Sequence, residues 1–289
     1  METRWLYTNS QDFDTLREAS ANTCVIPMGC VEKHSIYLPL GTDIIATSHI
    51  AYEASKLETF SVFPDYIFGD YPDGSPNAPK GSVTVTPRLQ IELLDELCTQ
   101  IARNGYNKII IYNGHGGNSG LLSVFGRNYL NQKRDYVFAT MHDATDVPHG
   151  MAEYILENGE DSVPEMTKED IELVMKYHKE DMLVGHACMS EAAYIMDVSP
   201  ENVHLDRLGK ENGLSRHKTD YLAKAGLYLP NAWDINYPDA FTGHDPVGLN
   251  ERISRAAVRL EAERLAKAVK LFKEDENVLR WHEERQRGW

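Results

Sequence analysis

The stretch VEKHSIYLPLGTD occupies residues 31–43 and closely follows the apolar run Thr23–Met28. A continuous apolar run of this length predicts a strand that is covered on both faces, as in a parallel sheet. The stretch itself contains Glu32, His34 and Asp43, whose side chains are of the kinds that bind hard or borderline metal ions. We therefore expect a polar loop with metal-binding capacity at the end of a buried strand.

Segments with strand-like and helix-like patterns alternate along the rest of the chain. Further strands are expected at 60–68, 82–86, 107–113 and 135–141, and helices at 12–20, 44–57, 89–103, 119–131, 168–181 and 250–273. Asp43 is placed to be the N-cap of the helix at 44–57. This alternation predicts an α/β fold with a mostly parallel sheet between layers of helices.

The remaining segments are expected to be irregular. They are 143–164, the aromatic-rich and proline-rich stretch 212–245, and a charged C-terminal tail at 275–289. Such a tail usually frays, but Trp281 and Trp289 favour burial, so the tail could pack on a neighbouring subunit. No repeat or linker divides the sequence, so residues 1–289 are expected to form a single domain.

Composition narrows the class of protein. An apolar content of 42% and a charged content of 25% are ordinary for a soluble globular chain. The formal net charge of -15 argues against nucleic acid and anionic membranes as partners, because both would repel it. No window offers the roughly 20 apolar residues of a membrane span, and no secretory signal is visible. The four cysteines do not form a disulfide pattern, so we expect free thiols and a cytoplasmic location.

Two further polar motifs could meet the first. NGHGGN at 113–118 follows the predicted strand 107–113, and GHACMSE at 185–191 comes later in the chain. In open α/β sheets, ligands bind beyond the carboxyl ends of the strands, where residues of different motifs can converge. A tight turn or a phosphate site would also explain the glycines around His115, but the P-loop lysine is missing. The three motifs taken together favour a metal site.

The loop GDYPDGSPNAPKG at 69–81 leaves two interpretations open. It could be a plain surface connection, or a lid over a substrate, since long loops without regular structure often carry function.

These motifs resemble those of the creatininase (creatinine amidohydrolase) family. Its members carry E-x-H, L-P-x-G-T-D, N-G-H-G-G-N and H-A-G-E-x-E-T. In this chain the corresponding residues are 32–34, 38–43, 113–118 and 186–192. The resemblance extends over roughly residues 20–270.

The resemblance implies a three-layer α/β/α fold and a hydrolase with two divalent metal ions, which could be Zn, Mn or Fe. By position, Asp43 would bridge the two ions. Glu32 and His115 would complete one site, and His34 and Glu191 the other. A hydroxide held between two such ions is a nucleophile at neutral pH.

His186 matches a histidine that transfers protons in the family, and it would protonate the leaving atom. Glu191, from the same motif, would be the second residue of the catalytic pair. The family also forms oligomers, often hexamers, so a homo-oligomer is expected. The other expected partner is a small-molecule substrate.

The third motif departs from the family pattern at Cys188, Met189 and Ala192. The residues expected to line the substrate site therefore differ from those of the family. The resemblance implies cleavage or ring opening of a small cyclic or amide-type substrate. The altered residues leave an alternative open, C–C ring opening of the cyclic keto-inositol 3-dehydro-scyllo-inosose. A non-catalytic metal-dependent binding protein is a third hypothesis.

Overall fold

The structure is a computed structural model that describes residues 1–71, 78–143 and 146–287. These residues form a four-stranded sheet in the order β2-β1-β3-β4, with every neighbouring pair parallel. The strands are β1 (Thr23–Met28), β2 (Ser61–Val62), β3 (Lys108–Asn113) and β4 (Val137–His142). The predicted α/β class with a parallel sheet is confirmed.

The helices follow and separate the strands. They are η1 (Trp5–Tyr7), α1 (Phe13–Ala19), α2 (Thr42–Leu57), α3 (Pro87–Arg103), α4 (Asn118–Leu130), α5 (Val147–Asn158), η2 (Glu160–Ser162), α6 (Lys168–Lys179), α7 (Met189–Val198), η3 (Pro200–Asn202), η4 (Leu205–Arg207), α8 (Asp220–Lys224), α9 (Ala232–Asn236), α10 (Glu251–Glu274) and α11 (Asn277–Gln286).

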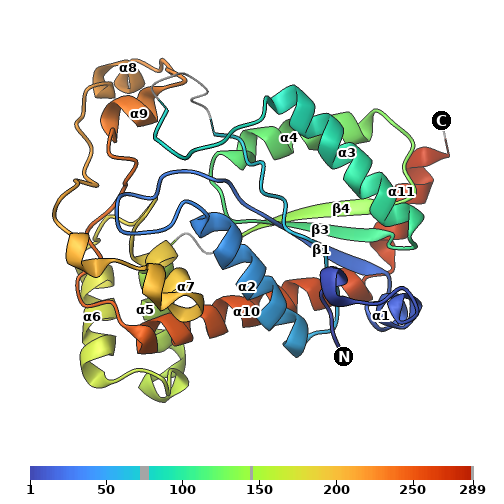
Figure 1. Ribbon diagram of the computed structural model, residues 1–289, viewed down its shortest axis with the longest axis horizontal. Helices are drawn as coiled ribbons and strands as arrows, with labels where there is room; N and C mark the ends of the chain where they lie inside the picture. The colour runs from blue at the N-terminus through green and yellow to red at the C-terminus, as the bar shows by residue number, and fades with distance from the viewer. Residues whose placement is uncertain (72–77, 144–145, 288–289) are drawn as a thin grey trace.

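The fold has three layers (Figure 1). Helices α3 and α4 cover one face of the sheet, and α2, α7 and α10 cover the other. Within β1, Val25 packs into the α2/α7/α10 side, whereas Cys24 and Ile26 pack into the α3/α4 side. All six residues of β1 are buried, and so are all six of β3. This explains why both strands have continuous apolar sequences: each face has its own core.

The carboxyl ends of the three longer strands lie at the same level. Met28, Asn113 and His142 are paired with one another through the register of β1, β3 and β4. The loops that follow β1 and β3 therefore start side by side at one edge of the sheet. This edge is where ligands bind in open α/β sheets.

Two expected strands are much shorter than predicted. Only Ser61–Val62 of the segment 60–68 forms a strand. Pro64, two residues further on, has no N–H to donate and interrupts the ladder, which resumes only as an isolated bridge between Tyr66 and Met28. In the segment 82–86, Val83 makes only an isolated antiparallel bridge to Val31.

The segments expected to be irregular contain helices. α5 occupies 147–158, with Pro148 in its first turn, where a missing N–H costs nothing. The Asp146 side chain accepts a hydrogen bond from the His149 N–H and caps this helix. The short helices α8 and α9 interrupt the loop 212–245.

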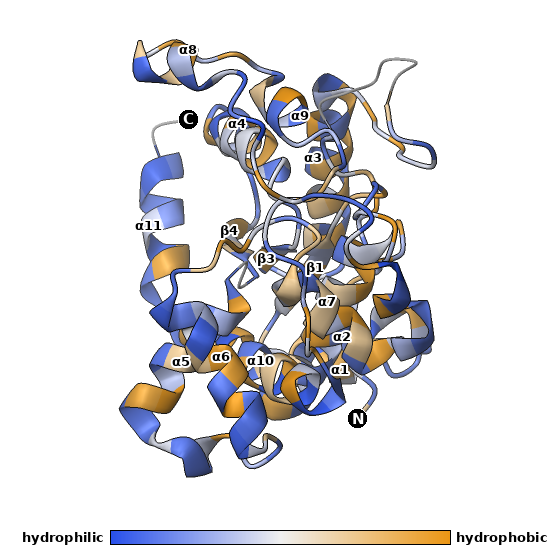
Figure 2. Cartoon of the chain, turned by 90° about the vertical axis from the view of Figure 1, so that its left-hand side faces the viewer, coloured by the Kyte–Doolittle hydropathy of each residue, from blue (hydrophilic) through white to orange (hydrophobic). Residues whose placement is uncertain are grey.

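The described part of the C-terminal tail is mostly helical. It forms α11, which lies beside β4 and is largely hydrophilic (Figure 2). The Gln286 side chain accepts a hydrogen bond from the Arg134 N–H at 2.8 Å and donates one to the Arg134 carbonyl at 2.7 Å. These two bonds anchor the end of the helix. Across the described ranges, no helix has both the length and the apolar character that a bilayer crossing requires.

Candidate metal centre

The five predicted metal-binding side chains come together at the carboxyl edge of the sheet. Glu32 and His34 lie in the loop after β1, and His115 lies in the loop after β3. Asp43 is in the first turn of α2, and Glu191 is in the first turn of α7. The four residues other than Glu191 are buried.

Asp43 is not an N-cap, contrary to the expectation. The N-cap of α2 is Gly41, and no side chain makes a cap hydrogen bond there. Asp43 lies two residues further on, so its carboxylate projects from the first helical turn into the site. The L-P-x-G-T-D turn therefore presents the carboxylate to the site, and the capping interaction is absent.

The two carboxylate oxygens of Asp43 face two different groups of side chains. Oδ1 lies 2.7 Å from His34 Nε2, which in turn lies 3.5 Å from Glu191 Oε2. Oδ2 lies 3.2 Å from His115 Nδ1, which lies 2.7 Å from Glu32 Oε1. The site thus has two halves that share one carboxylate.

Each histidine of the site is oriented through its other ring nitrogen. His34 Nδ1 lies 3.2 Å from the Glu32 carbonyl, and His115 Nε2 lies 3.1 Å from the Asp70 carbonyl. His186 Nε2 lies 2.8 Å from the Lys33 carbonyl. A carbonyl can only accept, so in each ring the nitrogen beside it carries the proton. When a metal ion replaces the proton on the nitrogen that faces the carboxylates, that nitrogen would offer its lone pair to the ion, as in histidines that bind metals.

One buried oxygen tests whether these residues fit a metal ion. Glu32 Oε1 lies 2.7 Å from His115 Nδ1, yet among the described residues it has no hydrogen-bond partner. Leaving a buried carboxylate oxygen unsatisfied is costly. A cation that accepts electron pairs from both atoms would satisfy both. The three carboxylates of the site carry three negative charges, which suits the four positive charges of two divalent ions.

The NGHGGN motif forms a closed loop around His115. Asn113 Nδ2 donates to the His115 carbonyl at 2.7 Å, and Asn118 Nδ2 donates to Asn113 Oδ1 at 2.7 Å. Asn118 Oδ1 accepts from the Asp70 N–H at 2.7 Å. Gly117 packs so closely that a Cβ there would lie 2.4 Å from both the Asp70 carbonyl and His115 Nε2. The glycine is thus needed for the contact that orients the histidine.

The third motif places His186 and Glu191 together. Ala187, between them, has a φ of 53°, a backbone conformation that is rare for a residue with a side chain. Its N–H donates to Glu191 Oε2 at 2.5 Å. The His186 ring lies 4.2 Å from the His34 ring, centroid to centroid. His186 Nδ1 is 3.8 Å from Glu32 Oε1 and 4.0 Å from Glu191 Oε1, so it faces both halves of the site.

The side chains of the site shift one another's pKa values. Burial lowers the pKa of His34, but the neighbouring carboxylates of Asp43 and Glu191 outweigh it and raise the value to about 10. Burial likewise opposes the charged form of Asp43, yet His34 and His115 hold its pKa well below the usual range. For Glu191 burial dominates, and its pKa is raised. Metal ions compete with protons for such groups.

Two features of the site were not anticipated from the sequence. The Asp70 backbone bonds to both His115 and Asn118, although Asp70 belongs to the loop considered as a lid or a surface connection. Trp233 of α9 contacts the His186 ring edge to face, with the centroids 5.4 Å apart. The abundance of aromatic residues in 212–245 was the only signal for it. Residues 72–77 of the loop 69–81 lie outside the described residues.

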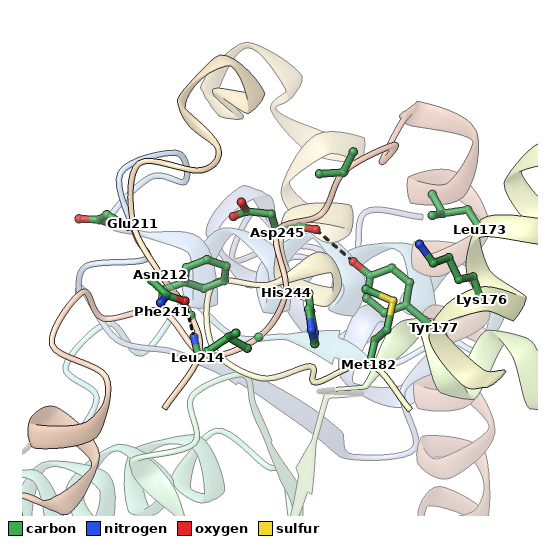
Figure 3. A pocket seen from close by; sticks show the side chains of 13 residues that line it. Leu173, Lys176, Tyr177, Met182, Glu211, Asn212, Leu214, Phe241, His244 and Asp245 are labelled. Carbon is green, nitrogen blue, oxygen red and sulfur yellow. Dashed lines mark hydrogen bonds between the residues drawn. The ribbon is translucent and has the colours of Figure 1, made fainter. Parts of the chain in front are cut away.

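A separate pocket of about 470 Å³ lies behind the third motif. His244 and Glu211 line it together with apolar side chains such as Phe241 and Met182 (Figure 3). None of the predicted metal-binding or catalytic residues lines it. Glu211 connects it to the site, because its carboxylate accepts hydrogen bonds from Lys33 Nζ at 2.6 Å and from Ser35 Oγ at 2.7 Å.

Comparison with known proteins links this arrangement to one family. The sequence model of the family described as Creatininase: Creatinine amidohydrolase matches residues 7–269. Among solved structures, a protein from Bacteroides fragilis NCTC 9343 assigned as a creatinine amidohydrolase is 20% identical, with a TM-score of 0.66, over 96% of this chain and 99% of that chain.

Two creatininase structures also match over 95% of this chain and 100% of theirs, each with 14% identity. A mutant creatininase of Zn-Zn type has a TM-score of 0.65, and an Mn creatininase has a TM-score of 0.64. At these identities the likeness shows a common fold. A comparison with curated protein sequences found no match.

Proposed function

The chain belongs to the creatininase family of metal-dependent hydrolases, and on that premise we propose that it is a two-metal hydrolase that cleaves or opens a small cyclic or amide-type substrate. The observation that carries the proposal is the division of the site into two halves that share Asp43. Glu32 and His115 form one half, and His34 and Glu191 the other.

Two divalent ions held there would generate a nucleophile from water and polarise the attacked bond. Zn and Mn are the ions named for the solved creatininases, and nitrogen and oxygen ligands suit Zn, Mn and Fe alike. The role of the protein is to hold the ligands in place, which it does through the Glu32 and Asp70 carbonyls behind His34 and His115.

His186 is the proposed proton carrier. Its Nε2–H is engaged by the Lys33 carbonyl, so Nδ1 is the nitrogen that is free to accept a proton near the carboxylates of Glu32 and Glu191. The same nitrogen can then deliver that proton to the leaving atom of the substrate. Trp233, edge-on to this ring, would border the substrate on the open side of the site.

A second substrate class is favoured by one feature. The Lys33 ammonium, the Ser35 hydroxyl and the Glu211 carboxylate form a polar group beside the site, and such groups can bind the hydroxyls of a polyol. Cys188 and Met189 of the third motif are buried and do not line an open wall, so this alternative rests on the polar group alone. The alternative proposal is therefore C–C ring opening of a cyclic keto-inositol.

The proposal is tested by metal content and turnover together. Glu32→Ala and His34→Ala should each reduce the metal bound per chain and abolish turnover. His186→Gln should keep the metal and lose turnover, whereas His244→Gln, in the separate pocket, should keep both. If metal content were unchanged in Glu32→Ala and His34→Ala, the proposed site would be wrong.

The substrate class is tested on the metal-loaded protein with two panels. Turnover of creatinine or another cyclic amide would support the amidase proposal. Turnover of cyclic keto-inositols alone would replace it with C–C cleavage. Bound metal with turnover in neither panel would favour a metal-dependent binding protein.

The proposal includes a homo-oligomer in the cytoplasm. The expectation of an assembly comes from the family resemblance, and Trp281 on α11, which is 56% exposed, is available for a contact between subunits. The four cysteines are free and buried, as expected in a reducing compartment. Light scattering of the metal-loaded protein tests the assembly, and a monomer at micromolar concentration would contradict it.

A further inference from the structure

Cys30 is a buried cysteine between the end of β1 and Glu32. Its backbone N–H donates to Asp43 Oδ2 at 3.3 Å, on the side of Asp43 that faces His115. Its Sγ contacts the Gly69 carbonyl at 3.6 Å. The backbone of Gly69 is so close that a Cβ there would lie 2.7 Å from Cys30 Cβ. The thiol is therefore held in one place next to the site.

The thiol lies within reach of one half of the site. Cys30 Sγ, a carboxylate oxygen of Glu32 and a ring nitrogen of His115 all lie within 4.8 Å of one another. Two ligand bonds of about 2.3 Å span at most about 4.6 Å, so a single cation would bind these atoms after a small inward shift of the side chains. Glu32 Oε1 of this cluster is buried, pairs electrostatically with His115 and has no hydrogen-bond partner among the described residues, which indicates that a cation binds there.

We propose that Cys30 is an additional ligand, which supplies sulfur to the cation held by Glu32, His115 and Asp43. This inference rests on the proposed two-metal function. When the sulfur–metal bond forms, the S–H bond breaks and the proton passes to solvent. This half of the site then has a mixed set of sulfur, nitrogen and oxygen ligands.

The other half has no such sulfur. Cys188 lies three residues before Glu191, but its Sγ donates to the Gly185 carbonyl at 2.8 Å and accepts from the Gly185 N–H at 3.1 Å. Thiolate ligands select zinc, whereas carboxylate-rich sites accept manganese. The two halves should therefore differ, with a preference for zinc at the half that contains Cys30.

X-ray absorption at the zinc edge tests the proposal on the zinc-loaded protein. A sulfur neighbour at about 2.3 Å should be present in the wild-type protein, beside nitrogen and oxygen at about 2.0–2.1 Å. Cys30→Ser should remove the sulfur signal, and the matched control Cys188→Ser should retain it. A wild-type spectrum with only nitrogen and oxygen neighbours would overturn the inference, whether or not the variants fold.

Competition between the metals gives a second measurement. Cys30→Ser should lower the preference for zinc over manganese by about tenfold or more. Substitution of a residue that only hydrogen-bonds to a metal ligand already lowers metal affinity by about 10- to 100-fold. An unchanged preference would count against the ligand role. Metal bound without sulfur would refute only the role of Cys30, whereas a protein that binds no divalent metal would refute the two-metal function itself.

Discussion

Asp43 Oδ1 lies 2.7 Å from His34 Nε2, with both side chains buried at the carboxyl edge of the sheet. The opposite oxygen of Asp43 faces His115 at 3.2 Å. A carboxylate with its two oxygens turned toward two histidines has the geometry of a bridging ligand. Its position in the first turn of a helix fixes this orientation, because the backbone around it is held by helical hydrogen bonds.

Asp43→Asn should therefore affect both metal positions at once. Asparagine keeps the shape but replaces one oxygen with an NH₂ group and removes the negative charge. We expect the affinity for both ions to fall by about 100-fold or more. Substitution of a residue that only supports a ligand lowers metal affinity by up to about 100-fold, and loss of a ligand itself should cost at least as much. Metal per chain after dialysis, measured by atomic emission, checks this.

Glu53→Gln is the matched control for this substitution. Glu53 lies on the same helix, and among the described residues its one ion pair is with Lys56. This variant should retain the full metal content. If Asp43→Asn also retained it, the carboxylate would not be a shared ligand.

Gly117→Ala should disturb only the half of the site that contains His115. The added Cβ would lie 2.4 Å from the Asp70 carbonyl and from His115 Nε2, so their hydrogen bond could not persist. We expect about a 10- to 100-fold loss of affinity for one ion and a loss of about 1–3 kcal/mol of stability from overpacking. Zinc titration with thermal unfolding measures both quantities.

The neighbouring Gly116→Ala provides the control, since no atom of the described residues lies within 4 Å of a Cβ at that position. It should leave metal binding unchanged. Equal effects from the two substitutions would mean that the loop is sensitive to any change, and would remove Gly117 as the specific support of His115.

The sequence predicted the parts of the fold that depend on local pattern. β1 and β3 were recognisable because both faces of each strand are buried, which makes their sequences continuously apolar. β2 is shorter than the apolar segment 60–68 because Pro64 interrupts the ladder, and only an isolated bridge at Tyr66 follows. α5 differs from the expected irregular segment because Pro148, a residue typical of irregular structure, lies in the first turn of the helix, where proline is tolerated.

The residues of the candidate site were predictable because strand ends converge and the motifs are specific. The contacts that hold these residues in position were not predictable. The Asp70 carbonyl reaches His115 across 45 residues of sequence, and Trp233 reaches His186 across 47. Such contacts depend on tertiary packing, and a backbone carbonyl has no signature in the residue type. The single-domain assignment and the roles of the site residues stay predictions.

The buried carboxylate of Asp170 should make stability depend on pH in the acid range. Burial raises its pKa, but hydrogen bonds from Arg252, the Thr167 N–H and Asn250 outweigh this and hold the pKa well below the usual value. A depressed folded pKa stabilises the protein above the unfolded value of about 3.9 and ceases to do so as the pH falls through the folded value.

Asp170→Asn should thus be less stable than the wild-type protein by about 1–3 kcal/mol near pH 7, and the difference should shrink below about pH 4. Urea unfolding at a series of pH values measures it, with Asp161→Asn on the exposed turn η2 as the control. A difference that stayed constant down to pH 3 would show that the charge of Asp170 is not what stabilises the fold.

Removal of metal should destabilise the whole protein, because the ligands come from four separate segments. Glu32, Asp43, His115 and Glu191 are brought together from the loops after β1 and β3 and from the starts of α2 and α7. A ligand at 100 times its dissociation constant adds about 2.7 kcal/mol of stability. We therefore expect a chelator to lower the melting temperature of the wild-type protein and the addition of zinc or manganese to restore it. The chelator should not change the melting temperature of Asp43→Asn, which has no metal to lose. If the chelator lowered the melting temperature of both proteins equally, the metal responsible would be bound elsewhere. Metal at this site would then not be what stabilises the fold.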